Sequence, residues 1–81
     1  MNIYLIYQNK MTNYDSYDSA VVCAEDEKHA KFIHPSKLIS KWDGIGDDCW
    51  PDITHVNVQL VGRAHEGIKT GCVVCSSFNA G

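Results

Sequence analysis

The chain has 81 residues, 44% of them hydrophobic and 21% charged, which suits one globular domain spanning residues 1–81 with a single core and excludes a disordered chain. The net charge of −3 lacks the basic excess that phosphate neutralisation requires, so direct nucleic-acid binding is not expected. No apolar run approaches the roughly 18 residues of a membrane span, so no membrane partner is expected.

Two strands are predicted in the first part of the chain. Residues 2–8 carry apolar or aromatic side chains at both odd and even positions, which is typical of a central strand and not of a signal peptide. The polar segment 8–19 is predicted to be a long loop or the tip of a hairpin. Residues 20–24 then form a short apolar run, predicted to pair with the first strand.

A short helix is predicted over residues 25–33. Acidic residues gather in its first turn and basic residues toward its end, which matches the helix dipole. Ala30 and Ile33 lie three apart and are expected to face the sheet. Pro35 disfavours helical geometry at His34, so we expect the helix to end there.

Two further strands are predicted after an irregular segment. Residues 36–52 contain both tryptophans and a glycine-broken acidic stretch, whereas residues 54–62 alternate cleanly and residues 71–77 form a last strand. The order strand–strand–helix–strand–strand predicts an α+β fold: an antiparallel sheet of about four strands with one short helix packed on it.

The four cysteines and four histidines raise the question of metal or thiol chemistry. Cys72 and Cys75 have zinc-knuckle spacing, but the two valines between them favour a strand, in which side chains three apart point to opposite faces. No helix is expected after Cys72 to lower a thiol pKa. We therefore predict no metal and no cofactor, and we expect the protein not to be an enzyme. A cysteine nucleophile with a histidine base is the weakest of the alternatives.

Surface features favour recognition of another protein. Tyrosine supplies contact area at low entropic cost, and exposed aspartates complement a basic surface. One of Trp42 and Trp50 is expected to fill the core, while the other is as readily exposed as buried. The alternative is that the charges only keep the domain soluble. The predicted partner-binding residues are Tyr14, Asp15, Tyr17, Asp18, Asp43, Asp47, Asp48 and Trp50.

A small polar ligand is the second hypothesis. If the C-terminal segment folds back onto the sheet, its hydroxyl and carboxamide groups join those near the end of the helix. The predicted ligand-binding residues are His34, Ser36, Ser77 and Asn79. A homodimer through exposed sheet edges is compatible with either hypothesis.

Three segments stand out together: Tyr14-Asp15-Ser16-Tyr17-Asp18-Ser19-Ala20-Val21-Val22, Ile33-His34-Pro35-Ser36 and Ser77-Phe78-Asn79-Ala80-Gly81. In this combination the chain resembles small accessory proteins encoded by bacteriophages and prophages, and the likeness covers most of the chain. The resemblance implies a product of the bacterial cytoplasm that acts by occupying a host protein, including CRISPR effectors and other anti-phage defence components. We therefore expect a non-enzymatic inhibitor of a host protein complex that presents a basic surface, with sequestration of a nucleotide signal as the alternative.

Overall fold

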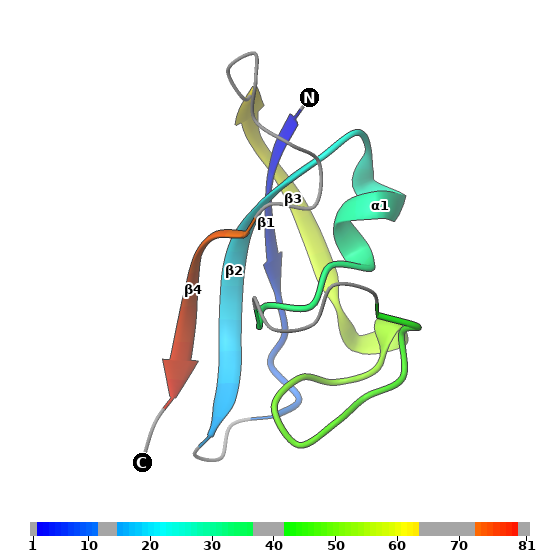
Figure 1. Ribbon diagram of the computed structural model, residues 1–81, viewed down its shortest axis with the longest axis vertical. Helices are drawn as coiled ribbons and strands as arrows, with labels where there is room; N and C mark the ends of the chain where they lie inside the picture. Colours follow the sequence, from blue (N-terminus) through cyan, green and yellow to red (C-terminus); the bar gives the residue numbers. More distant parts are fainter. Residues whose placement is uncertain (1, 12–14, 37–41, 64–72, 80–81) are drawn as a thin grey trace.

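The described residues form a four-stranded antiparallel sheet with one short α-helix. A computed structural model describes residues 2–11, 15–36, 42–63 and 73–79. Within these ranges it confirms the predicted α+β architecture and the order of the elements (Figure 1). The elements are β1 (Asn2–Tyr7), β2 (Ser16–Ala24), α1 (Glu27–Lys31), the 3-10 helix η1 (Ile53–His55), β3 (Asn57–Arg63) and β4 (Val73–Asn79).

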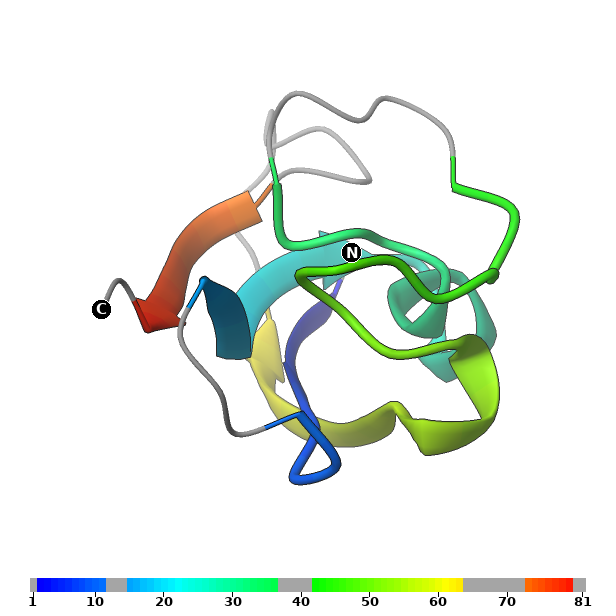
Figure 2. The ribbon, with the colours of Figure 1, turned by 90° about the horizontal axis from the view of Figure 1, so that it is seen from below.

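The strand order in the sheet is β3-β1-β2-β4, with every neighbouring pair antiparallel. β1 is therefore a central strand, as its two apolar faces predict, and β3 and β4 form the two edges. The sheet is curved, and α1 and the loop before β3 lie together on its concave side (Figure 2). Neither helix in the described ranges is long and apolar enough to cross a bilayer.

The core lies between the concave face of the sheet and the segments that cover it. Trp50 is completely buried and is the largest side chain of this core, so one tryptophan fills the core as predicted. Ala30 is also completely buried and Ile33 packs against the cluster, which confirms the predicted inner face of the helix. The buried cluster consists of Tyr4, Ile6, Ala20, Val22, Ala24, Ala30, Trp50 and Val56.

β2 begins at Ser16, so the prediction of a loop as far as residue 19 is wrong. The register passes from the pair Tyr17–Phe78 to the pair Ser19–Ser77, which leaves Asp18 as the extra residue of a β-bulge. This bulge shifts the alternation by one residue, and Tyr17 therefore packs against the buried cluster. Residues 16–19 are mostly polar, so their composition does not indicate a strand; they form one by pairing with β4, which lies far away in the sequence.

α1 and β3 are both shorter than predicted. The carboxylate of Asp26 accepts a hydrogen bond from the backbone N–H of His29 at 2.9 Å and caps α1, which ends at Lys31 rather than at His34. Asp52 accepts from the backbone N–H of Thr54 in the same way, so that residues 53–55 form η1 and β3 starts only at Asn57.

Candidate functional site

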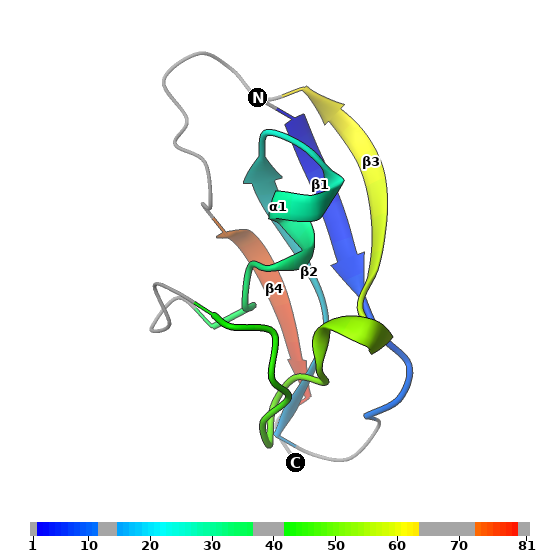
Figure 3. The same ribbon diagram turned by 90° about the vertical axis from the view of Figure 1, so that its right-hand side faces the viewer.

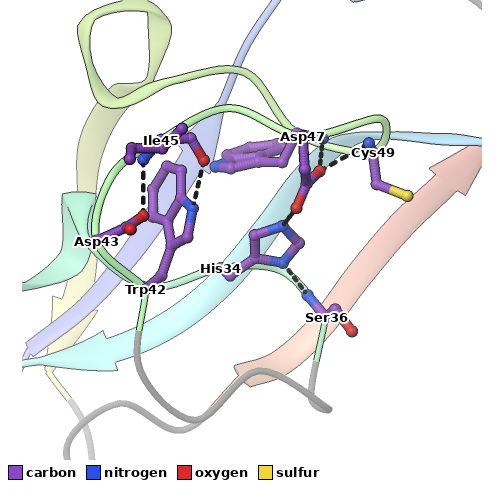
Figure 4. Close-up of polar contacts among 8 residues, drawn as sticks. His34, Ser36, Trp42, Asp43, Ile45, Asp47 and Cys49 are labelled. Atoms are coloured by element: carbon purple, nitrogen blue, oxygen red, sulfur yellow. Dashed lines mark hydrogen bonds and ion pairs between the residues drawn. The ribbon is translucent and has the colours of Figure 1, made fainter.

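A partly buried polar contact joins His34 to Asp47 (Figure 4). His34 is 3% exposed, and its Nε2 atom lies 2.8 Å from Oδ2 of Asp47. Its Nδ1 atom accepts a hydrogen bond from the backbone N–H of Ser36 at 3.0 Å. Because Nδ1 accepts this bond, Nε2 is the ring nitrogen that donates to the carboxylate. Both ring nitrogens are engaged in structural hydrogen bonds.

The same aspartate fixes the loop in which it lies. Oδ1 of Asp47 accepts from the backbone N–H groups of Cys49 at 2.8 Å and of Trp50 at 2.9 Å. Burial by itself would raise the pKa of Asp47, but these two hydrogen bonds, together with His34, outweigh burial and lower the pKa below its ordinary value. Asp47 is therefore an ionised anchor for residues 42–52, which we call the acidic loop.

The His34 ring also contacts two aromatic side chains, Tyr17 and Trp42. The His34 ring meets Trp42 edge to face at a centroid distance of 5.6 Å and Tyr17 at 6.3 Å. Trp42 in turn donates from Nε1 to the backbone carbonyl of Ile45 at 2.8 Å (Figure 4). His34 thus connects the start of β2, the end of α1 and the acidic loop.

Three carboxylates gather around Cys49. Burial raises the pKa of the Cys49 thiol, and the negative charges of Asp47, Asp48 and Asp15 raise it further. The backbone N–H of Tyr17 donates to the carbonyl of Cys49 at 2.9 Å, which brings Asp15, just before β2, beside the acidic loop. We call Asp15, Asp47 and Asp48 the acidic patch.

The structure places only some of the predicted partner-binding residues at the surface. The acidic patch brings Asp15 and Asp48 together, both exposed, and Asp18 and Asp43 are also exposed. Tyr14 lies outside the described residues.

Two of the predicted partner-binding aromatic residues point inward. Trp50 is wrongly placed in this surface, because its side chain is completely buried in the core and reaches no partner. Tyr17 is half-buried against His34 instead of being exposed at a loop tip, because the bulge at Asp18 turns it toward the core.

Of the predicted small-ligand residues, His34 is buried in the structure. Ser36 lies beside His34, whose side chain is buried and uses both ring nitrogens in hydrogen bonds within the protein. Ser77 is exposed on β4 opposite Ser19, and Asn79 is in register with Ser16.

The described part of the chain contains no group of three histidine, cysteine or acidic side chains placed to hold a metal ion. Cys23 is completely buried and Cys49 is half-buried. Cys72 lies outside the described residues, whereas Cys75 lies in β4, in the extended geometry that the flanking valines predict.

Sequence reasoning missed the contact between His34 and Asp47. Its local part has a sequence signal, since an aspartate whose side chain accepts from the backbone N–H groups two and three residues further on is typical of an Asx turn. The contact between His34 and Asp47 itself has no sequence signal, because no local pattern indicates that a residue after α1 will lie beside the middle of the acidic loop.

No protein-family model, curated protein or solved structure matches the chain.

Proposed function

We propose that the protein is a non-enzymatic binding protein that inhibits a host protein complex by placing its acidic patch on a basic surface. The observation that carries this proposal is the hydrogen bond from the backbone N–H of Tyr17 to the carbonyl of Cys49, which holds Asp15, two residues before Tyr17, beside the loop that carries Asp47 and Asp48. A protein complex that binds nucleic acid, such as a CRISPR effector, presents a basic surface of the required kind. The resemblance to proteins of bacteriophages and prophages favours this class of partner.

The acidic patch is preorganised for binding. Its loop is fixed by the hydrogen bonds of Asp47 to His34, Cys49 and Trp50, so little ordering remains for the moment of association. No lysine or arginine among the described residues forms an ion pair with Asp15 or Asp48. Exposed carboxylates of this kind accelerate encounter and select for a positively charged partner.

The chemistry of the two most reactive residue types near the patch supports binding rather than catalysis. A general base needs a ring nitrogen that can take a proton from the nucleophile, and His34 uses both of its nitrogens. A nucleophilic cysteine needs a lowered pKa, whereas burial and the neighbouring carboxylates raise the pKa of Cys49.

The test is capture of a partner from bacterial lysate, followed by affinity measurement with variants. Asp15 has a φ of 64°, so Asn is the neutral residue that keeps this backbone conformation. We expect the double variant Asp15→Asn/Asp48→Asn to weaken binding about fivefold, which corresponds to roughly 1 kcal/mol for two exposed ion pairs.

The matched control is Glu25→Lys, an exposed residue after β2 whose replacement gives the same change in net charge. It should leave the affinity unchanged. Equal weakening by both variants would reduce the effect to net charge alone, and an unchanged affinity in the double variant would rule out the acidic patch as the binding surface.

A further inference from the structure

The free edge of β3 carries exposed apolar side chains. In the described structure β3 pairs only with β1, so one side of its backbone is left without a neighbouring strand. Leu60 is 56% exposed and Val61 is 60% exposed on this edge strand. An unpaired edge offers its backbone N–H and C=O groups to another extended chain.

A groove of about 410 Å³ runs between the start of β3 and α1. Val56 is buried and Val58 is half-buried, and together they form an apolar floor. Figure 3 shows α1 and β3 on the same side of the molecule. The other lining residues are polar or charged: Glu27, Lys28 and Lys31 from α1, and Asn57 from β3.

The cations of the described structure gather around β3. Lys28 and Lys31 line the groove, and Arg63 is the last residue of the strand. The Nζ atom of Lys10 lies 3.2 Å from Nε2 of His55, two residues before β3 begins. These four are the only lysines and arginines among the described residues, so β3 is flanked by positive charge in a protein whose net charge is −3.

We propose that the β3 edge and the groove beside α1 form a second docking surface, which binds an extended acidic segment of a partner protein by strand addition. The backbone of the segment pairs with β3, its alternate apolar side chains face the groove and Leu60, and its carboxylates approach Lys28, Lys31 and Arg63. The sign of this surface is opposite to that of the acidic patch, so the two surfaces select different partners.

A second copy of the chain fits this edge poorly. Antiparallel pairing of β3 with β3 places Asn57, beside which Lys28 and Lys31 lie, next to Arg63 of the second copy. Like charges opposite each other destabilise a strand pair. The cations that oppose self-pairing are the same ones that attract an acidic strand.

The experiment uses the whole chain and three fluorescein-labelled octapeptides: one of alternating valine and glutamate, one of alternating valine and lysine, and the glutamate peptide with a central proline. We expect the glutamate peptide to bind by fluorescence anisotropy and to shift the amide resonances of residues 57–63. Lys28→Gln and Lys31→Gln should each weaken binding about two- to fivefold. Glutamine keeps the helix propensity of α1.

Val74→Glu is the matched control, because it changes the net charge by the same amount on the other edge strand, where Val74 is 52% exposed. It should leave binding unchanged, as should Asp15→Asn/Asp48→Asn, which separates this surface from the acidic patch. Equal binding of the lysine or proline peptide, amide shifts outside β3 and α1, a dimer formed through β3, or no saturable binding would each overturn the proposal.

Discussion

The Nε2 atom of His34 lies 2.8 Å from Oδ2 of Asp47, thirteen residues further along the chain. The same carboxylate accepts the backbone N–H groups of Cys49 and Trp50 through its other oxygen. One aspartate therefore ties the acidic loop to the segment after α1 and also sets the turn that delivers Trp50 into the core.

Replacement of Asp47 should cost far more stability than replacement of its neighbour. Asp47→Ala leaves the Nε2–H of the buried His34 and two backbone N–H groups without their acceptor, and we expect a loss of about 1–3 kcal/mol in the free energy of unfolding. The control Asp48→Ala changes an exposed residue and should stay within about 0.5 kcal/mol of the wild type. Urea denaturation followed by circular dichroism measures both, and equal losses would contradict the anchoring role.

Stability should fall in acid, in part through Asp47. A carboxyl group whose pKa is lower in the folded than in the unfolded chain stabilises the fold at any pH above its ordinary pKa, and this contribution is lost as the pH falls through the lowered value. Asp26, hydrogen-bonded by His29, and Asp52, hydrogen-bonded by Thr54, have lowered pKa values as well and act in the same direction.

We therefore expect the urea midpoint of the wild type to decline below about pH 4. In Asp47→Asn the decline should be shallower, and the two curves should converge at the acidic end. Parallel curves across the whole range would mean that the ionisation of Asp47 does not support the fold.

Two glycines should respond in opposite ways to alanine. Gly44 has a φ of +86°, and a Cβ atom there would lie 3.0 Å from Cε1 of Phe32 and 3.3 Å from Cβ of Ile53. Gly44→Ala should therefore cost at least about 1–2 kcal/mol. Gly62 lies in β3, where an added Cβ atom would meet no described atom of another segment within 4 Å, so Gly62→Ala should stabilise by about 0.4–1 kcal/mol. Thermal unfolding of both variants provides the comparison, and a destabilised Gly62→Ala would count against the described edge.

Trp50 separates the contribution of its ring from that of its indole N–H. Trp50→Ala removes the largest side chain of the core and should cost about 3–5 kcal/mol. The Nε1 atom is buried with no hydrogen-bond partner among the described residues, and burial of such a group is unfavourable. Trp50→Phe removes this group and keeps an aromatic ring, so its loss should be about 1 kcal/mol or less. A phenylalanine variant as unstable as the alanine variant would indicate that the N–H has a partner.

The elements that could be predicted are those whose pattern is local. The apolar side chains on both faces of β1, the charge order of α1 and the apolar run at the end of β2 each follow from neighbouring residues. The first half of β2 could not be predicted, because residues 16–19 are polar and become a strand through pairing with β4. The bulge at Asp18, which turns Tyr17 inward, has no signature in composition or periodicity.

The candidate site divides in the same way. Exposed aspartates could be identified from charge alone, and the expectation that one tryptophan fills the core is confirmed by Trp50. Which tryptophan it is depends on the turn that Asp47 sets, and this turn depends on His34, a contact between distant segments. His34, Asp47 and Trp50 stabilise the fold, although the sequence analysis assigned them to the binding of a ligand or a partner.

The central place of β1 in the sheet also governs how the chain reaches its native state. Its hairpin with β2 closes between neighbouring segments, but its other neighbour, β3, begins only at Asn57 and must return across the whole α1 segment. Pairings between segments this far apart slow the search for the native state. Refolding should therefore be limited by the arrival of β3 rather than by the formation of α1.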